Sequence, residues 1–321
     1  MIPPWADKSK RYTYLFESYV ILLLQMTKNQ TATAKITNIG FNVINRIMHG
    51  AAERGMSRRE LDHDQIRHLS LEEKSFRKGH NYISVLSSPS GNGLIIDVVN
   101  DRTTKSAQEL LKNSLDINQL KNIKTVSMDM WKAYIKAVKD TLPDTEIIHD
   151  RFHLAKYLNQ AIDKVRRREV KTNEGLLKNS RYALLKNQEN LTDNQKHKFE
   201  CIAKTNLSVS KAWLIKENFI DIYKYRGEPI TCLALFKQWA KSSQSTQIKE
   251  VSKVVTMFQN NISGVVNSMV YNLSNAMAER INGKIQILKS IARGYRTFTN
   301  FKKIRLDSFK NLIYSGSTTY F

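Results

Sequence analysis

The chain has 321 residues, 41% of them apolar and 25% charged, which is typical of a globular protein and excludes a disordered chain. Its 51 Lys and Arg residues outnumber 29 Asp and Glu residues, so the formal net charge is +22. Such an excess repels itself in a compact fold, and binding a polyanion relieves that repulsion. Nucleic acid is therefore the expected partner, and a basic solubility surface or a ribosome-associated protein is the alternative.

Two cysteines, Cys201 and Cys232, are too few for a disulfide framework or for a zinc site built from four cysteines. We expect reduced thiols and a cytoplasmic, nucleoid-associated protein. The longest apolar run near the start, residues 19–24, is too short to cross a membrane, and Glu17 precedes it, which does not fit a secretory signal. No membrane partner is expected.

Residues 1–62 are predicted to form a helix-turn-helix-like DNA-binding segment. The first helix has apolar residues at helical spacing, namely Tyr12, Leu15, Tyr19 and Leu22. A break at residues 37–40 precedes a second helix, which has one apolar face made of Val43, Ile44, Ile47 and Met48. The second helix of a helix-turn-helix enters the major groove, so DNA contacts are expected from its polar residues Asn42, Asn45 and Arg46. Any helical hairpin with a glycine turn shares this pattern.

Residues 63–153 are predicted to form the first part of an α/β domain with a mixed sheet. Three strands are expected at residues 66–71, 82–86 and 94–99, with a strong turn signal between the last two. A helix at 104–115, a strand at 123–128, a helix at 131–139 and a short strand at 146–148 follow. An antiparallel trio joined to parallel strands through crossover helices is the topology of a ribonuclease H-like sheet.

The remainder of the chain is predicted to be helical. Residues 154–268 show helical patterns and no convincing strand, so we interpret them as a large all-α insertion. Residues 269–321 would supply a catalytic helix and a basic carboxyl-terminal segment. Within 284–310, eight Lys and Arg residues face a single Asp, which is typical of a phosphate-binding surface.

Three acidic residues are the candidate catalytic and metal-binding groups: Glu72, Asp129 and Glu279. Asp129 follows a predicted central strand, where α/β sheets place their ligands, and Glu72 lies on a neighbouring strand. Carboxylates held close together repel one another, and divalent cations relieve that repulsion. Each residue also has a plain alternative: Asp129 as a helix cap, Glu72 with Glu73 as a solvated pair, and Glu279 in a surface ion pair. The rival acids at comparable strand ends are Asp97, Asp101 and Asp150.

Four ordered motifs carry a resemblance to a known family. They read LEEKSFRKGHNY (71–82), VSMDMWKAY (126–134), IHDRFHL (148–154) and SNAMAERIN (274–282). In these motifs the sequence resembles bacterial insertion-sequence transposases of the DDE type, in the ISL3 family. The similarity covers residues 65–170 and 270–310 well and residues 10–60 more loosely.

The resemblance implies a DNA transposase that cuts at element ends and joins the 3′-ends to target DNA, using two Mg²⁺ or Mn²⁺ ions. It makes Asp129 the second catalytic acid and Glu279 the third, with Glu72 where the family usually has its first aspartate. The extra methylene of Glu72 moves its carboxylate by about one C–C bond, which predicts a slow or inactive copy. Asp150 and His153 would lie near the metals, or else form a helix-capping aspartate with a packed histidine.

The resemblance also implies double-stranded DNA as the partner, both element ends and target, and a homo-oligomer assembled on that DNA. The expected phosphate contacts are Arg166, Arg167, Arg168, Lys284, Lys289, Arg293 and Arg296. Family members usually carry an amino-terminal zinc module, so this sequence is predicted to be an amino-terminally short copy. Two rivals remain: a catalytically inactive DNA-binding relic or repressor, and a structure-specific nuclease on the same fold.

Overall fold

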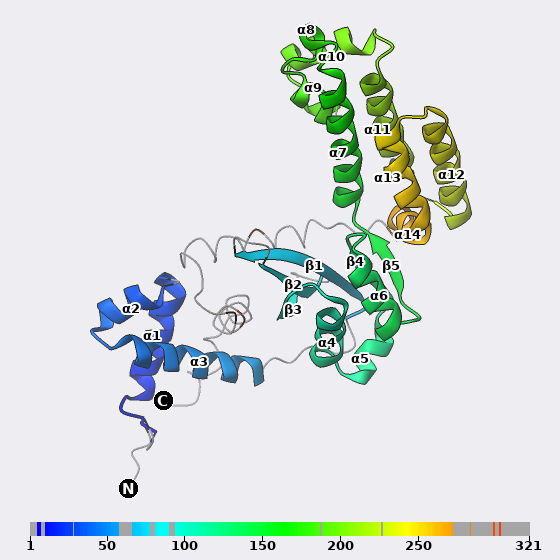
Figure 1. Ribbon diagram of the computed structural model, residues 1–321. Helices are drawn as coiled ribbons and strands as arrows, with labels where there is room; N and C mark the ends of the chain where they lie inside the picture. The colour runs from blue at the N-terminus through cyan, green and yellow to red at the C-terminus, as the bar shows by residue number, and fades with distance from the viewer. Residues whose placement is uncertain are drawn as a thin grey trace. The chain divides into compact units, whose positions relative to one another are not determined.

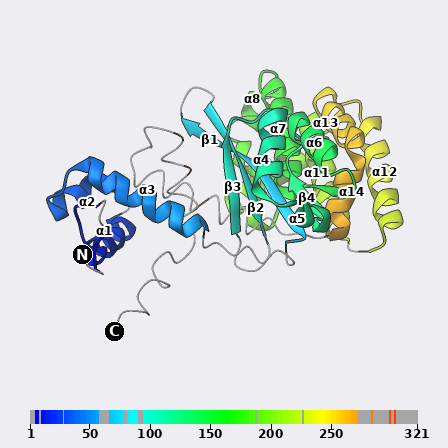
Figure 2. The same cartoon turned by 90° about the horizontal axis from the view of Figure 1, so that it is seen from below.

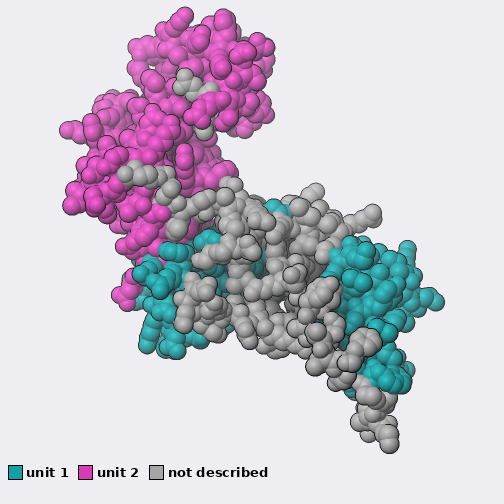
Figure 3. Space-filling view, turned by 180° about the vertical axis from the view of Figure 1, so that it is seen from behind, with its two compact units in different colours: residues 1–124, 136–143, 276–321 teal, residues 125–135, 144–275 magenta. Residues whose placement is uncertain are grey.

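The structure is a computed structural model that describes residues 5–7, 10–27, 29–57, 66–77, 81–89, 94–186, 188–225 and 227–271, with Gly283, Phe298 and Lys302. It is a mixed α/β protein with one five-stranded mixed sheet and an amino-terminal helical segment (Figure 1). Contacts divide the chain into two compact units, coloured separately in Figure 3. One unit comprises residues 1–124, 136–143 and 276–321, and the other comprises 125–135 and 144–275.

The amino-terminal segment is a bundle of three helices, α1 (Tyr14–Thr27), α2 (Gln30–Thr37) and α3 (Phe41–Ser57), grouped together in Figures 1 and 2. Its core is formed by Val20 from α1 with Ile44 and Ile47 from α3. Asn38 ends α2 in the left-handed conformation, with φ of 51°, a conformation that asparagine adopts more readily than most residues. Because α3 places Ile44 and Ile47 in this core, the predicted second helix and its apolar face are confirmed.

The apolar repeat predicted in the first helix lies on the wrong side for the core. Leu15, Tyr19 and Leu22 are all exposed, whereas Glu17 and Val20 are buried. The helix was recognised correctly, but α1 is apolar on nearly every side, so spacing alone does not identify which face packs against α2 and α3.

Strands β1 (His68–Arg77), β2 (Asn81–Ser88) and β3 (Leu94–Asn100) form the predicted antiparallel trio. Helix α4 (Thr104–Ser114) follows and buries its predicted apolar face, and it packs on β2 and β3. The short helix α5 (Ile117–Asn122) was not predicted, although Asp116 and Gln119 form a capping box at its start.

Strand β4 (Thr125–Met128), helix α6 (Lys132–Thr141) and strand β5 (Glu146–His149) then follow, and β4 pairs with β5 in parallel. The strand order in the sheet is β3-β2-β1-β4-β5. All four residues of β4 are buried, as expected of a strand covered on both faces. The predicted alternation of strands and crossover helices is confirmed.

From residue 151 to residue 271 the described chain is helical. It contains α7 (Arg151–Glu169), α8 (Glu174–Leu177), α9 (Arg181–Leu185), a short 3-10 helix (Gln188–Asn190), α10 (Asp193–Ala203), α11 (Ser208–Lys224), α12 (Pro229–Ser245), α13 (Lys249–Asn260) and α14 (Ile262–Tyr271). The rings of Phe219, Trp239 and Phe258 pack against one another in its core. Glu169 at the end of α7 accepts the backbone N–H groups of Ser208 and Val209, which fixes the start of α11.

In the described part of the chain, every helix is too short or too polar to span a bilayer.

Candidate active site and DNA-binding surfaces

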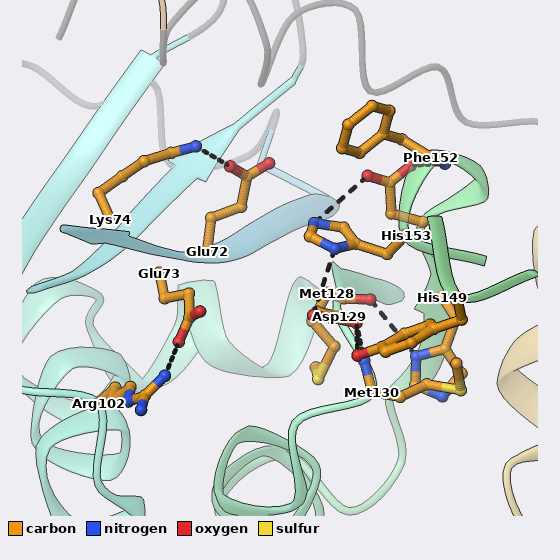
Figure 4. A network of polar contacts seen from close by, with 12 residues as sticks. Glu72, Glu73, Lys74, Arg102, Met128, Asp129, Met130, His149, Phe152 and His153 are labelled. Atoms are coloured by element: carbon orange, nitrogen blue, oxygen red, sulfur yellow. Dashed lines mark hydrogen bonds and ion pairs between the residues drawn. The ribbon is translucent and has the colours of Figure 1, made fainter. Parts of the chain in front are cut away.

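Asp129 lies directly after β4, and three groups from the same unit hold its carboxylate (Figure 4). Its Oδ1 accepts hydrogen bonds from the Met130 backbone N–H at 2.7 Å and from the Tyr157 hydroxyl at 3.0 Å. Its Oδ2 lies 3.2 Å from Nδ1 of His153. The Asp129 side chain is 23% exposed, so solvent or a ligand can still reach it.

Helix α7 supplies most of this arrangement. Asp150 caps its first turn by accepting the Phe152 N–H at 3.0 Å, as one of the two alternatives for this residue expected. His153 and Tyr157 are four residues apart and therefore lie on one face of the helix, and both contact Asp129. Oδ2 of Asp150 lies 3.9 Å from Nε2 of His153. His153 thus lies between two carboxylates.

The pKa values of this cluster favour charged groups. Burial acts to lower the pKa of His153, but contact with Asp129 and the charge of Asp150 outweigh it, so the pKa is raised above its usual value. Burial acts to raise the pKa of Asp129, but His153, Tyr157 and the Met130 N–H outweigh it, so that pKa is lowered. Asp129 is therefore an anion at neutral pH, as a metal-binding carboxylate must be.

His149, at the end of β5, is a buried residue that lies against the end of β4, next to Asp129. It is 2% exposed, and its Nδ1 lies 3.4 Å from the Met128 carbonyl oxygen. Burial lowers its pKa to about 4 against weaker opposition from the Met128 carbonyl and Asp129, so the imidazole is neutral. Gly264 of α14 lies against this ring, and a Cβ at that position would come within 2.5 Å of it.

Glu72 and Glu73 lie in the middle of β1 and point to opposite sides of the strand (Figure 4). The Arg102 guanidinium, 2.8 Å away, pairs with Glu73 and stacks over the Tyr82 ring. Glu72 lies 3.6 Å from the Lys74 ammonium, and its side chain is largely buried. They are therefore not a solvated pair at a strand end, and Glu73 has a partner of its own.

Two of the rival acids have structural partners of their own. Asp97 forms an ion pair of 2.8 Å with Lys302. Asp101 adopts a left-handed backbone, with φ of 76°, and accepts the Arg102 N–H, as turn aspartates often do.

Several predicted site residues lie outside the described residues: Glu279, Lys284, Lys289, Arg293 and Arg296. The arginine run in α7 is described, and all three side chains are ion-paired. Arg166 and Arg167 pair with Asp163, whereas Nη1 of Arg168 donates to both carboxylate oxygens of Glu250. Arg167 and Arg168 remain well exposed, but Arg166 is mostly buried.

On α3, Asn42 and Arg46 are exposed one turn apart, on the face opposite the bundle core. Asn45 is half-buried, and its Oδ1 accepts a hydrogen bond from Gln30 in α2 at 3.2 Å. Asn42 and Arg46 are thus free of the bundle packing, while Asn45 helps to hold α2 against α3.

Tyr157 was not predicted as a site residue. Its signal in the sequence is its position four residues after His153, on the same helix face. Among the described residues, no group of three or more His, Cys, Asp or Glu side chains gathers as a metal site. Asp129 nevertheless suits a hard divalent cation, because it offers carboxylate oxygens, and in the described part of the chain the polar contact given for Oδ2 is the one with His153.

Comparison with known proteins decides the family. A transposase family model of the ISL3 type matches residues 69–305, and the helix-turn-helix domain of transposase family ISL3 matches residues 1–52. The chain belongs to the ISL3 family of insertion-sequence transposases. Its helix-turn-helix match covers α1, α2 and most of α3, and the transposase match runs from β1 beyond α14.

Two similar proteins are transposases of named elements. The transposase for insertion sequence element IS1001 of Bordetella parapertussis is 25% identical over 299 residues, covering 91% of this chain and 72% of the relative. The transposase for insertion sequence element IS1557 of Mycobacterium tuberculosis (strain ATCC 25618 / H37Rv) is 24% identical over 322 residues, covering 92% and 71%. The predicted family and function, a DNA transposase of an insertion sequence, are therefore confirmed, and with them DNA as the partner.

Proposed function

We propose that this transposase cuts DNA at the ends of its element and joins the 3′-ends to target DNA, with Glu72, Asp129 and Glu279 as the metal-binding acids of a ribonuclease H-like core. The observation that carries the proposal is the Asp129 carboxylate, which is ionised, partly exposed and held by His153 and Tyr157. A carboxylate used only as a helix cap needs neither of these two partners.

The topology supports the ribonuclease H-like assignment. An antiparallel trio is followed by two parallel strands, in the order β3-β2-β1-β4-β5. This is the arrangement expected when the strand that carries Glu72 and the strand that precedes Asp129 belong to one catalytic sheet. Asp129 occupies the carboxyl end of its strand, where α/β sheets place ligands.

The residues around Asp129 define how it would hold an ion. Its Oδ1 already accepts two hydrogen bonds, so Oδ2 is the oxygen with lone pairs left for Mg²⁺ or Mn²⁺. His153 and Tyr157 fix the orientation of the carboxylate, as partners of metal ligands do in other sites. A bound pair of divalent ions would supply activation of the attacking oxygen and stabilisation of the leaving oxygen.

DNA binding is proposed to involve Asn42 and Arg46 on α3, with Asn45 in support, in the major groove. Arg167 and Arg168 are exposed enough to contact phosphates if their present ion pairs open, and Lys284, Lys289, Arg293 and Arg296 are proposed from sequence alone. Arg166 is proposed to support this surface from beneath, because it is mostly buried against Asp163. A homo-oligomer on paired element ends is expected.

The test is a plasmid assay with the element ends, Mg²⁺ or Mn²⁺, and separate readouts for nicking, strand transfer and DNA binding. We expect Asp129→Asn, Glu279→Gln and Glu72→Gln to abolish nicking and strand transfer while duplex binding persists. Asp193→Asn is the matched control, because that carboxylate is fully exposed in the helical unit. Wild-type protein that binds element ends but never nicks them would favour the inactive relic, and nicking without joining would favour a nuclease.

A further inference from the structure

Helix α1 is apolar on most of its circumference, and the three-helix bundle buries only one side of it. The helix contains no Lys or Arg, and its single acid, Glu17, is buried in ion pairs with Lys10 and Arg54. Val20 is fully buried on the same side, with Leu24 partly buried beside it. An apolar helix face normally packs against another element.

The other side carries four exposed apolar residues, which we call the outer stripe: Leu15, Tyr19, Leu22 and Met26. Their exposed fractions are 82%, 48%, 44% and 72%. At about 100° per residue, the four positions fall within about 60° of one another, across the helix from Glu17. Their spacing alternates between four and three residues, which is the a/d pattern of a coiled-coil seam.

The chemistry of the outer stripe indicates what kind of partner it can bind. No side chain of the stripe can neutralise a phosphate, so DNA does not fit it. In a chain of net charge +22, an uncharged patch is also where two copies can approach with least repulsion. If a fully exposed side chain of this size presents roughly 200 Å², the stripe amounts to roughly 500 Å² per copy. Two copies would then bury roughly 1,000 Å², which reaches the threshold for a specific interface.

We propose that the outer stripe of α1 is a self-association surface, on which α1 of a second copy packs through the same four residues. A two-fold interface uses the same patch on both subunits, and the a/d spacing makes this patch self-complementary. The pairing joins two helix-turn-helix segments without using α3, so both α3 helices stay available to DNA. The proposal does not depend on the catalytic assignment.

The test is sedimentation velocity of the full chain without DNA, over a range of protein concentrations. We expect a concentration-dependent dimer for the wild type and at least a tenfold weaker dimer for the double variant Leu15→Glu with Leu22→Glu. Both positions are exposed, so thermal unfolding of the variant monomer should match that of the wild type. Ile36→Glu is the control, because Ile36 is an exposed apolar residue of α2 outside the stripe, and this variant should dimerise as the wild type does.

Three results would overturn the proposal. One is a wild type that stays monomeric while the double variant unfolds at lower temperature, because another segment of the same chain then covers the stripe. Another is a wild type that stays monomeric with unchanged stability in the variant, which would assign the stripe to a different protein or a lipid surface. The last is a double variant that dimerises as tightly as the wild type.

Discussion

At the scale of single residues, the Tyr157 hydroxyl is the contact most directly tied to the proposed chemistry. It donates to Oδ1 of Asp129 at 3.0 Å and leaves Oδ2 as the accessible oxygen. We expect Tyr157→Phe to lower strand transfer by about 10- to 100-fold and to raise the Mg²⁺ concentration needed for half-maximal activity, because outer partners orient metal ligands. A titration of activity against Mg²⁺ measures both effects.

Tyr182→Phe is the control for this change, since Tyr182 is an exposed tyrosine of α9 in the same helical unit. It should leave both quantities unchanged. If Tyr157→Phe behaves like the control, the Tyr157 hydroxyl does not position Asp129, and Tyr157 contributes only through the packing of its ring.

His149 predicts how stability depends on pH. Burial lowers its folded pKa to about 4 from 6.5, so the unfolded chain binds a proton that the folded chain rejects between these values. Above pH 6.5 the buried imidazole is neutral in both states and does not lower the free energy of unfolding. As the pH falls from 6.5 towards 4, that free energy decreases because only the unfolded chain takes up the proton. A shift of this size corresponds to about 3 kcal/mol of unfolding free energy.

The measurement is urea unfolding at several pH values, compared between the wild type and His149→Gln. Carboxylates also titrate in this range, so the informative quantity is the difference between the two proteins. We expect that difference to shrink or change sign from pH 7 to pH 4, because only the wild type has this imidazole. A constant difference would mean that His149 is already accessible to protons in the folded state.

At the scale of secondary-structure elements, α14 is held tightly against β5 at the edge of the sheet. Asn267 donates to the Ile147 carbonyl at 3.2 Å, and Gly264 leaves room for the His149 ring. A Cβ at residue 264 would lie 2.5 Å from that ring, so we expect Gly264→Ala to destabilise the protein by about 1–3 kcal/mol. Thermal or urea unfolding measures the change.

Gly175→Ala is the matched control, because Gly175 is also helical and no atom lies within 4 Å of its added Cβ. It should be neutral or stabilising by up to about 1 kcal/mol. The double variant Gly264→Ala with His149→Ala should be less destabilised than the sum of its single changes. Additive effects would show that the two residues do not compete for the same space.

Elements and their faces differ in how well the sequence predicts them. The strands were placed correctly along the chain because buried apolar runs and turn residues mark them, as at β4. Their ends were predicted less well: β1 was expected to end at residue 71 but continues through a polar stretch to Arg77, which places Glu72 inside the strand. The core face of α3 was predicted because polar residues occupy its other side. The core face of α1 was not, because Leu15 and Val20 look alike to any periodicity argument and only the packing of the bundle distinguishes them.

The sequence predicted some residues of the candidate site and missed others. Asp129 follows from its place after a buried strand, and His153 from a motif shared with a family. Tyr157 and Gly264 were missed, because their importance arises from contacts with Asp129 and His149 that are distant in the sequence. Glu279 lies outside the described residues, so its role stays a prediction.

At the scale of the whole molecule, the net charge of +22 predicts that DNA binding is largely electrostatic and weakens as salt rises. Each phosphate that the protein neutralises releases condensed counterions, so the logarithm of the binding constant falls linearly with the logarithm of the salt concentration. If 6 to 10 phosphates are contacted, affinity for any duplex should fall by about 10³- to 10⁵-fold between 50 and 200 mM salt. Fluorescence anisotropy with labelled duplexes measures the slope.

Two variants test which residues contribute to DNA binding and whether their contacts depend on the DNA sequence. Asp129→Asn changes a metal ligand and should leave the slope for duplex binding within error, whereas Arg46→Gln on α3 should weaken binding to element ends more than binding to unrelated DNA. This difference is expected because a helix in the major groove contacts base edges, while phosphate contacts respond equally to every sequence. A uniform loss on both duplexes would instead make Arg46 a phosphate contact, and no loss would remove α3 from the DNA interface.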